Sequence, residues 1–340
     1  MSKTIIIIGA GLAGLSAALQ AAENGCNVKL VSSLPSERAQ SVMAEGGINA
    51  ALNTKDENDS PEEHFTDTIK AACGLADPNA VWGMTQAAPE LVHWLLKFGV
   101  KFNMSGYDDV DLRNFGGQKK KRTAFAQSDT GKQIMTAMID AVRRKEASGM
   151  VERFSHHSFL TLRLCGNICC GCVIRDEYSQ ETVELPGDAV IVATGGMHGL
   201  FGNTTGSLSN TGEVTAELFR LGVPLANGEM IQYHPTTVKC GGKRMLISEA
   251  ARGEGGRLFA MKDGKQWYFM EEKYPELGNL MPRDITAREI WKVSHESEVF
   301  LDMTEISEEI ISNKLSGLAD DCMTYLHKDI PVSYTHLRAH

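Results

Sequence analysis

The clearest pattern of hydrophobic and polar positions lies at the N-terminus. Thr4–Ile8 holds four consecutive isoleucines, which predicts a buried strand, and the alanine-rich stretch that follows predicts a helix ended by Gly25. Asn27–Ser32 then predicts a second strand. The stretch from Thr4 to Ala22 carries no charge. The strand–helix–strand pattern nevertheless explains it better than a signal or membrane segment does.

Three glycines connect the first strand to the helix. Gly9, Gly11 and Gly14 have the spacing G-x-G-x-x-G in the context that dinucleotide binding requires. The first permits a tight turn, the second lets backbone approach a pyrophosphate, and the third allows helix and strand to pack closely. The second strand ends in Ser32 and Ser33, not in the acidic residue that binds ribose in nicotinamide enzymes. The pattern therefore favours FAD.

A second apolar strand with a glycine turn occurs near the middle of the chain. Ala189–Val192 is followed by Ala193-Thr194-Gly195-Gly196, which is typical of the point where two-dinucleotide-binding proteins return beneath the flavin. Downstream, Asn210 and Glu213 have the spacing of a capping box and predict a helix that ends at Leu221-Gly222. These segments predict an α/β fold with a doubly wound FAD-binding domain of the two-dinucleotide-binding type.

Other helices have clear starting signals. Ser60-Pro61 and Asp77-Pro78 each place a capping residue before a proline at the first helical position. A further helix is predicted from about Thr130 to Glu146.

Composition excludes several function classes. A chain of 340 residues predicts two or three domains, and a net charge of −9 argues against a nucleic-acid partner. We interpret the one basic run, Lys119–Arg122, as a solvated loop.

The eight cysteines are too few and too irregular for a secreted disulfide framework, so we expect a reducing cytoplasm. Four of them lie between Cys165 and Cys172. Their spacing leaves little room to fold around a metal, which favours a β-hairpin with Gly166-Asn167 as its turn and Cys170 and Cys172 on one face. A metal or iron–sulfur site is the alternative.

One segment concentrates candidate chemistry. Between His234 and Asp284 the chain carries a histidine, a hydroxyl, a carboxylate and two arginines, interleaved with glycines; they are His234, Ser248, Glu249, Arg252 and Arg283. Arginine forks match carboxylates bidentately, so this set could bind a small dicarboxylate and move a proton to it. Taken alone, the arginines could equally form surface ion pairs, and His234 could be a strand-end histidine bound to backbone.

Taken together, these motifs resemble the flavoprotein subunits of fumarate reductase and succinate dehydrogenase, a family that also includes L-aspartate oxidase. The matching landmarks extend from Thr4 to about Val332 and include Arg38–Gly47, Arg113–Gly117 and Asn210–Gly212. The resemblance implies an α+β capping domain beside the FAD-binding domain. It divides the chain into an FAD-binding part, residues 1–233, a partial capping or substrate domain, residues 234–332, and a non-native tail, residues 333–340.

The resemblance also implies how the cofactor is held. Gln40 stands where membrane-linked members form a covalent flavin–histidine bond. An amide cannot form that bond, so we expect non-covalent FAD and, since losing the link generally lowers the flavin potential, a preference for fumarate reduction. The implied FAD contacts are Gly9, Ala10, Gly11, Gly14, Ser32, Ser33, Ser41, Val42, Ala44, Glu45, Gly46, Gly47, Ala193, Thr194, Gly195 and Glu213.

For the substrate, the resemblance implies that His234 and Ser248 bind one carboxylate. It makes Arg283 the proton donor, reloaded through Glu249 and Arg252, so that Arg283, Arg252, Glu249 and His234 are the catalytic residues. Arginine is normally a very weak acid. However, Arg283 precedes a helix predicted from Asp284 to about Val293, whose N-terminus disfavours a cation and so promotes proton donation.

Phe115 indicates the branch of the family. Aspartate oxidases carry a glutamate at this place, where it can pair with the substrate ammonium, whereas Phe115 cannot balance a buried positive charge. As a substrate-binding residue it therefore favours fumarate and succinate. L-aspartate oxidase is the alternative, and a flavin electron-transfer protein without its own substrate is a second one. The His/Ser/Glu/Arg/Arg set argues against the electron carrier.

The end of the chain departs from the family pattern. Ser333–His340 matches no part of it, so His336 is not expected to be the family's second substrate histidine. The resemblance implies that this histidine, a carboxylate-binding arginine and the closing segment of the FAD site lie outside the sequence. We therefore expect the chain alone to bind flavin weakly and to be inactive.

Partners follow from what the chain lacks. The sequence has neither a haem motif nor cluster ligands of its own, so it does not identify the electron donor; an iron–sulfur subunit, free reduced flavin and a soluble reductase are the candidates. With no membrane segment of its own, the protein is expected in the cytoplasm, at the inner face of the membrane through such a partner.

Overall fold

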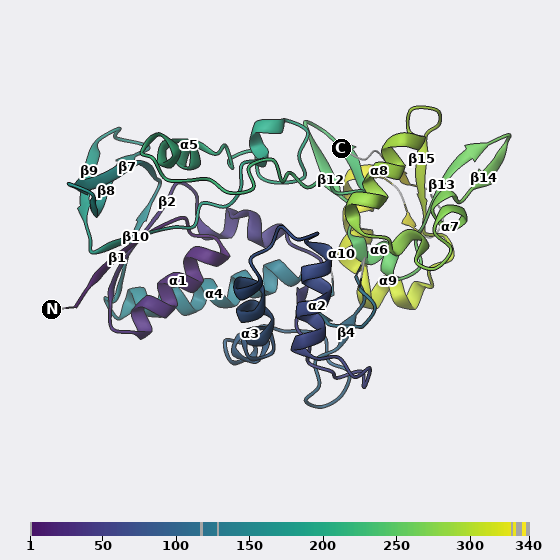
Figure 1. The fold of residues 1–340 in the computed structure, drawn as a ribbon, viewed down its shortest axis with the longest axis horizontal. Coiled ribbons are helices and arrows are strands. Elements are labelled where there is room, and N and C mark those ends of the chain that lie inside the picture. Colours follow the sequence, from purple (N-terminus) through teal and green to yellow (C-terminus); the bar gives the residue numbers. More distant parts are fainter. Residues whose placement is uncertain (1, 116–117, 128, 328, 331–334, 338–340) are drawn as a thin grey trace. The chain divides into compact units, whose positions relative to one another are not determined.

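The fold is that of a computed structural model, which describes residues 2–115, 118–127, 129–327, 329–330 and 335–337 (Figure 1). The chain divides into two units. Unit 1 comprises Met1–Ala44 and Gly131–Ile231, and unit 2 comprises Glu45–Thr130 and Gln232–His340. The second junction lies close to the boundary predicted at residue 233, while Glu45–Thr130 groups with unit 2. The division into domains 1–233 and 234–332 stays a prediction.

Unit 1 is built on a parallel sheet with the strand order β10–β1–β2–β6. Its strands are β1 (Thr4–Ile8), β2 (Asn27–Ser32), β6 (Val151–Ser155) and β10 (Ala189–Val192). Helix α1 (Leu12–Glu23) packs against β1 and β2 through the buried Leu15 and Leu19. The other long helix is α4 (Thr130–Ala147). The strand–helix–strand unit and the helix from Thr130 are confirmed.

An antiparallel sheet packs on this core. Its strands, in order, are β7 (His157–Cys165), β8 (Ile168–Asp176) and β9 (Thr182–Pro186). Cys172 and Ile174 join Ile6 and Ile8 in one hydrophobic cluster. A turn at Gly166-Asn167 joins β7 to β8, so the predicted hairpin is confirmed. The short helical turns of unit 1 are η1 (Ser36–Arg38), η2 (Gln40–Met43) and η3 (His198–Phe201).

Helix α5 (Glu213–Arg220) corrects the predicted capping box. The helix begins at Glu213 with Gly212 as its N-cap, so Asn210 is not the capping residue. Gly212 has the left-handed φ of 77° that glycine adopts at little cost. The Asn210 side chain is engaged elsewhere, with its Nδ2 3.1 Å from Nε2 of His198. The predicted end at Leu221-Gly222 is confirmed.

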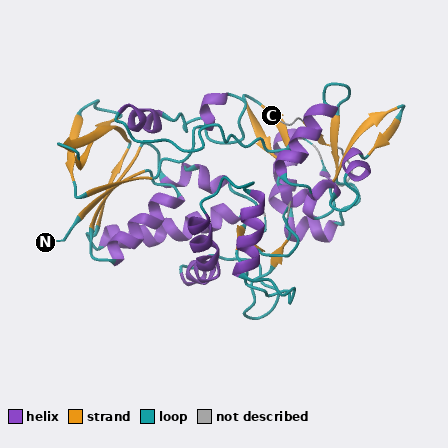
Figure 2. Ribbon diagram, in the orientation of Figure 1, coloured by secondary structure: helices purple, strands orange, loops and turns teal. Residues whose placement is uncertain are grey.

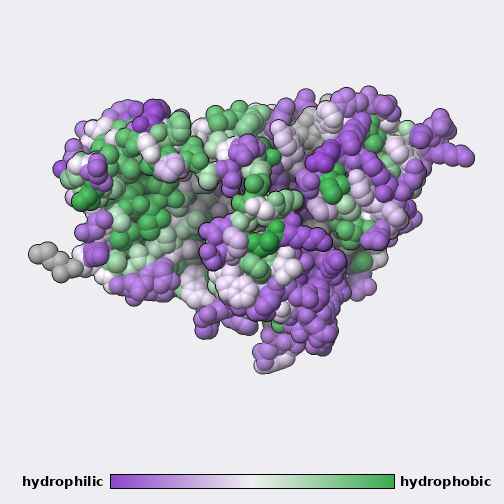
Figure 3. Space-filling model, viewed as in Figure 1, coloured by the Kyte–Doolittle hydropathy of each residue, from purple (hydrophilic) through white to green (hydrophobic). Residues whose placement is uncertain are grey.

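Exposed apolar side chains gather over the strands of unit 1, the green surface at the left of Figure 3. Strand β10 is an edge of the parallel sheet, and its Ile191 and Val192 are 39% and 38% exposed. An apolar sheet edge of this kind is a surface to which a further strand can be added.

Unit 2 contains a helical pair and a small sheet. Helices α2 (Pro61–Ala71) and α3 (Pro78–Lys97) pack against each other, with the rings of Phe65 and Trp82 edge to face at 5.2 Å. The Ser60 hydroxyl accepts a hydrogen bond from Glu63 N, and the Asp77 carboxylate accepts one from Asn79 N, so both predicted caps are confirmed. The sheet order is β3 (Ile48–Asn49), β5 (Thr123–Ala124) and β4 (Leu112–Arg113).

The remainder of unit 2 has the predicted α+β character (Figure 2). A hairpin of β11 (Thr237–Cys240) and β12 (Lys243–Leu246) precedes an antiparallel sheet in the order β14–β13–β15–β16. Its strands are β13 (Arg257–Lys262), β14 (Lys265–Trp267), β15 (Val299–Asp302) and β16 (Thr335–Leu337). The helices are α6 (Glu249–Gly253), α7 (Phe269–Lys273), α8 (Arg283–Val293), α9 (Glu308–Lys314), α10 (Ser316–Asp321), η4 (Gly278–Leu280) and the π-helical η5 (Cys322–Leu326).

One hydrophobic core joins these elements. It includes Ile247, Leu258, Ile290 and Leu301, all fully buried. Strand β16 pairs antiparallel with β15 inside the tail that the sequence marks as non-native. Residues 333–334 and 338–340 of that tail lie outside the described part, as do the landmark residues Gly116, Gly117 and Val332. Within the described residues, no helix is both long and apolar enough to cross a membrane.

The basic run at residues 119–122 is solvated only in part, because Lys119 and Lys121 are exposed but Arg122 is buried. The Arg122 side chain is 1% exposed, and its Nε and Nη2 donate to the two carboxylate oxygens of Asp59 at 3.1 and 2.8 Å. Lys120 donates to the Asn58 carbonyl at 2.7 Å and lies 2.6 Å from a Glu63 carboxylate oxygen. Contacts with the loop before α2, at Asn58 and Asp59, therefore hold Lys120 and Arg122 in place.

We predict that Arg122→Met destabilises the protein by about 3–5 kcal/mol, because it leaves the Asp59 carboxylate buried without its main partner. Methionine keeps most of the side-chain volume, so the loss reports the charge. Urea unfolding measures it. Lys121→Ala is the control, because Lys121 is 45% exposed and its ion pair to Glu57 spans 3.6 Å. The account is wrong if both variants unfold within about 0.5 kcal/mol of the parent.

Candidate functional site

A groove opens in unit 1 where the carboxyl ends of three parallel strands meet, with a volume of about 430 Å³. Ligands bind in open α/β sheets at such strand ends. The turns that follow β1, β2 and β10 all contribute to its lining. Of the predicted cofactor residues, the lining contains Gly9, Ala10, Gly11, Ser32, Ser33, Ser41, Ala193, Thr194, Gly195 and Glu213.

Glycine is required at Gly9 and at Gly14 for different steric reasons. A Cβ on Gly9, whose φ is 109°, would lie 2.3 Å from the Ala193 carbonyl oxygen. A Cβ on Gly14 would lie 1.8 Å from the Gly9 carbonyl oxygen. Gly14 therefore does not line the groove but lets helix α1 pack on the first turn, as the motif predicts.

Polar groups in the groove fit a dinucleotide. Helix α1 has Gly11 as its N-cap, without a side-chain cap and without an acidic residue in its first turn. Such a helix start attracts phosphate through its N–H groups and dipole. The Ser32 hydroxyl lies at the groove, buried, with no hydrogen-bond partner among the described residues. A ribose or phosphate oxygen would satisfy it, so the residues present fit FAD.

Gln40 also lines the groove. Its side-chain oxygen accepts a hydrogen bond from the backbone N–H of Ser207 at 2.5 Å. The Gln40 amide therefore anchors a neighbouring loop. Val42 and Ala44 do not line the groove, and Glu45, Gly46 and Gly47 belong to unit 2.

The candidate catalytic residues meet in unit 2 around the carboxylate of Glu249. Its Oε2 accepts a hydrogen bond from Arg283 Nε at 2.6 Å, and its Oε1 lies 3.6 Å from Arg252 Nη2. Glu249 and Arg252 are 3% and 2% exposed, whereas the Arg283 side chain is 35% exposed. Burial raises the pKa of Glu249, but Arg252 and Arg283 outweigh that effect and hold it below its usual range. The carboxylate therefore stays ionised between the two arginines.

Glu249 and Arg283 are each the first residue of a helix. Ser248 is the N-cap of α6 and accepts a hydrogen bond from Ala250 N at 3.4 Å, which sets Glu249 at the first helical position. Arg283 is the first residue of α8, one residue earlier than predicted. Its guanidinium thus lies at the positive end of the α8 dipole.

His234 contacts the backbone, as expected if it is a histidine bound to backbone at a strand end. Its Nδ1 lies 3.1 Å from the Thr236 carbonyl oxygen and 3.3 Å from Thr236 N. Burial, and after it the charges of Arg283 and Arg252, together lower the pKa of His234 to about 3. The ring is therefore neutral throughout the physiological pH range. The backbone contact does not exclude a ligand role, because no described residue hydrogen-bonds Nε2.

The sequence did not point to two residues that fix the arginines. Arg283 Nη1 donates to Gln232 Oε1 at 2.8 Å, and Arg252 Nη1 donates to the Asn279 carbonyl oxygen at 2.6 Å. The Asn279 side chain is itself held by Leu258 N at 2.9 Å and by the Glu271 carboxylate at 3.0 Å. The position of Gln232, two residues before His234, is a sequence signal that could have identified it as part of the site. Nothing in the sequence around Asn279 identifies it.

A second buried group packs on Ser248. Glu45 belongs to unit 2, and its Oε2 is buried without a hydrogen-bond partner among the described residues. Burial, and after it the carboxylate of Asp321, raise the pKa of Glu45 to about 8, although contact with the Ser248 hydroxyl opposes the shift. Glu45 is therefore largely a neutral acid at pH 7.

Arg113 holds the backbone that follows Glu45. Its guanidinium donates to the carbonyl oxygens of Glu45 and Gly46, at 3.2 Å for Glu45, and lies 4.4 Å from the ring centre of Phe125. Phe115 covers the same turn, because a Cβ on Gly46 would come within 2.8 Å of its ring. Phe115 thus lies beside Gly46 and under the charge of Arg113, 5.5 Å from its ring centre.

We predict that Glu45→Gln changes how stability depends on pH. The folded protein keeps the Glu45 proton up to pH about 8, whereas the unfolded chain releases it near the ordinary value of 4.5. Stability therefore falls as pH rises through this window, and glutamine, which cannot ionise, removes the fall. Urea unfolding at several pH values should show a gain for the variant that grows from pH about 5 to about 8. Glu276→Gln, at an exposed position, is the control. Parallel curves for parent and Glu45→Gln would contradict the assignment.

Comparison with known proteins shows the family. Residues 4–338 match the FAD binding domain family. The chain is 44% identical over 327 residues to the succinate dehydrogenase flavoprotein subunit of Bacillus subtilis (strain 168), covering 94% of this chain and 56% of that protein. It is 31% identical over 336 residues to the L-aspartate oxidase of Streptomyces coelicolor, covering 96% of this chain and 56% of that protein.

A solved structure agrees. The fold superposes on the Escherichia coli quinol fumarate reductase FrdA, in a variant form, with a TM-score of 0.90 and 26% identity, covering 100% of this chain and 60% of that chain. The chain spans just over half the length of the curated relatives it matches. It belongs to the FAD binding domain family, and within it is similar to the flavoprotein subunits of succinate dehydrogenase and fumarate reductase.

Proposed function

We propose that the full-length protein carrying this chain is an FAD-dependent oxidoreductase that interconverts fumarate and succinate, with fumarate reduction as its direction. The observation that carries the proposal is the buried Glu249 carboxylate between Arg252 and Arg283, with His234 close enough to feel both arginine charges. This cluster of cationic and neutral hydrogen-bond donors around a buried carboxylate supports reduction of a dicarboxylate.

FAD, when bound, supplies a hydride from its N5 atom. The groove residues would hold it: the α1 N-terminus and Gly11 at the phosphates, and Ser32 and Ser33 at the ribose. The flavin contacts proposed for Glu45, Gly46 and Gly47 rest on the family resemblance. FAD is proposed to be non-covalent, because the Gln40 amide cannot form a flavin bond and is engaged with Ser207.

His234 and Ser248 are proposed to bind one substrate carboxylate. In the tautomer in which His234 Nδ1 accepts from Thr236 N, Nε2 carries the proton and can donate it in a hydrogen bond. The depressed pKa keeps the ring neutral, so it binds without adding a third positive charge. The Ser248 hydroxyl accepts from the α6 backbone and also contacts the Glu45 carboxyl, so a substrate carboxylate would replace Glu45 as the acceptor of its hydrogen.

Arg283 is the proposed proton donor to the substrate carbon. Its side chain is 35% exposed and so can reach a ligand, while its Nε stays bonded to Glu249. After it gives up a proton, one can pass to it from Arg252 through Glu249, whose ionised carboxylate contacts both arginines. Burial lowers the pKa of Arg252, which eases transfer along this path.

Phe115 supports fumarate over an amino acid. Its ring occupies the place where an acidic group would pair with an ammonium, and the Arg113 guanidinium lies 5.5 Å from its centre. An ammonium would meet positive charge here without a counterion. L-aspartate oxidase therefore remains the weaker alternative, although such a protein is among the relatives. A flavin electron carrier would not need the Glu249 cluster.

For the partner of the full-length protein, we propose only a general class. The B. subtilis relative is named a flavoprotein subunit, so we propose that the full-length protein works with an electron-donating subunit, an iron–sulfur protein being the first candidate. Through such a partner it would act at the inner face of the membrane.

We predict that Arg283→Lys in the full-length flavoprotein lowers fumarate reduction by about 10²–10⁴-fold, the usual contribution of a positioned general acid. Lysine keeps the charge but not the guanidinium that bonds both Glu249 and Gln232. Steady-state kinetics with reduced donor measure the effect, with FAD content checked for each preparation.

The matched control is Arg288→Lys on the same helix, whose side chain is 60% exposed and 3.5 Å from Asp284. It should stay within about two-fold of the parent. Turnover of Arg283→Lys within a few-fold of the parent would remove Arg283 as the acid. Failure of reduced parent protein to be reoxidised by fumarate would instead point to the electron carrier.

A further inference from the structure

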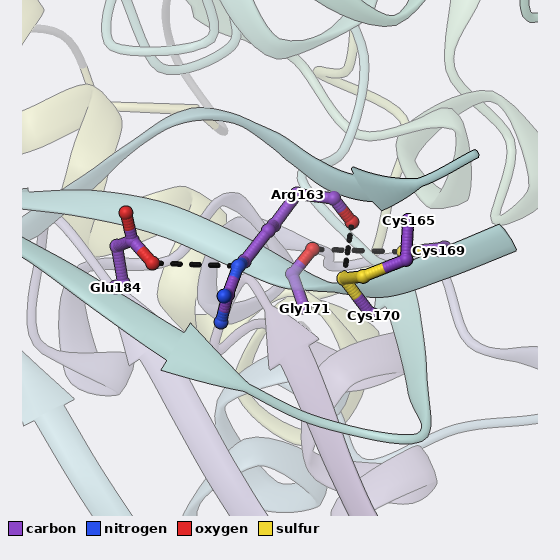
Figure 4. The surroundings of a disulfide bond; sticks show 6 residues. All are labelled: Arg163, Cys165, Cys169, Cys170, Gly171 and Glu184. Atoms are coloured by element: carbon purple, nitrogen blue, oxygen red, sulfur yellow. Dashed lines mark hydrogen bonds and ion pairs between the residues drawn. A yellow bond between two sulfur atoms is a disulfide. The ribbon is translucent and has the colours of Figure 1, made fainter. Parts of the chain in front are cut away.

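Three sulfur-bearing side chains gather at the tip of the β7–β8 hairpin (Figure 4). Cys165, the last residue of β7, is bonded to Cys170, with their Cα atoms 6.0 Å apart. Cys169, next in sequence to Cys170, keeps a free thiol. A Cα separation of 6.0 Å lies within the range that disulfides take up without backbone movement.

A β-bulge brings the two bonded cysteines together. Leu164 pairs with Cys169 and Arg163 pairs with Gly171, so Cys170 is the extra residue on its strand. Gly171 has φ 142°, and a Cβ there would come within 2.1 Å of the Leu185 carbonyl oxygen. The bulge therefore breaks the alternation that the sequence predicted for Cys170 and Cys172. It turns Cys170 toward Cys165 across the turn.

The remaining thiol of the hairpin is of another kind. Cys172 is fully buried in the core with Ile6 and Ile8, and burial raises its pKa to about 11. A thiol of this kind is a poor nucleophile. Cys165, in contrast, is exposed at the tip. Among the cysteines of the hairpin, the accessible thiols therefore lie at its tip.

We propose that Cys165 and Cys170 form a reversible thiol–disulfide exchange site that reacts with low-molecular-weight disulfides such as glutathione disulfide. The Cys165 thiolate attacks the small disulfide, forms a mixed disulfide and releases one small thiolate. The Cys170 thiolate then attacks the Cys165 sulfur, forms the Cys165–Cys170 bond and releases the second small thiolate. Two protein thiols are oxidised, one small disulfide is reduced to two thiols, and two protons leave the protein.

Exposure and loop size support reversibility. Exposed disulfides are the labile ones, whereas structural disulfides resist the glutathione pool. The bond closes a loop with a sequence separation of only 5, so it gains little from loop entropy. The disulfide does help to hold the bulge at Cys170. A hydrogen bond from Gly187 N to the Cys170 carbonyl oxygen, at 3.2 Å, holds the same residue.

The experiment equilibrates the whole chain in glutathione buffers from fully reduced to mainly oxidised, and then alkylates the free thiols in denaturant, so that the buried Cys172 also reacts. Trypsin releases the peptide from Leu164 to Arg175, which contains four of the cysteines. We expect four alkyl groups at the reducing end and two at the oxidising end, with the loss of both reversed by returning the sample to reduced glutathione. A peptide with four groups at every ratio would overturn the proposal. So would a disulfide that excess reduced glutathione leaves intact in the folded protein.

Neighbouring cysteines supply matched controls. Cys165→Ser and Cys170→Ser should each abolish the paired loss, whereas Cys169→Ser in the same peptide should keep it. Cys73→Ser, at an exposed lone cysteine of unit 2, should leave the titration unchanged. Loss of the pair in Cys169→Ser but not in Cys170→Ser would refute the assignment of the partners.

Discussion

The carboxylate of Glu249 is the group on which the arrangement of unit 2 depends. It is 3% exposed, and it lies between Arg252, which is 2% exposed, and Arg283. Removing a charge from water costs several kcal/mol, and only a well-matched partner offsets that cost. Without Glu249 two arginines would repel each other in a buried space. Asn279 and Gln232 complete the frame by accepting hydrogen bonds from the arginines on their other sides.

The two units offer different physical means of binding an anion. The groove of unit 1 uses mainly backbone: a helix start with Gly11 as its N-cap and glycines that admit a ligand, together with the buried Ser32 hydroxyl. The cluster of unit 2 uses fixed charges whose number is kept low, since His234 is neutral and Glu45 is largely protonated. A dinucleotide needs many weak donors along its length, whereas a small dicarboxylate needs a few strong ones. The division fits the proposed function.

Local signals in the sequence predicted local structure well. The glycine turn after β1, the caps at Ser60 and Asp77 and the start of α8 are set by residues a few positions apart. The grouping of Glu249, Arg252 and Arg283 was inferred from family resemblance. Contacts between distant segments were missed: Arg122 with Asp59, 63 positions away, and Arg252 with Asn279, 27 positions away. The Asn210 cap failed for a related reason, because His198 engages that side chain. Periodicity and capping rules carry no information on such partners.

The most direct measurement of the central claim is fumarate reduction by Glu249→Gln in the full-length flavoprotein. Glutamine keeps the shape of the side chain but cannot pass a proton between Arg252 and Arg283. The account predicts a loss of turnover of about 10²–10⁴-fold with FAD retained. Glu289→Gln, which removes another buried carboxylate paired with Lys273 and Lys292, should stay near the parent. Turnover of Glu249→Gln close to that of the parent would contradict the account.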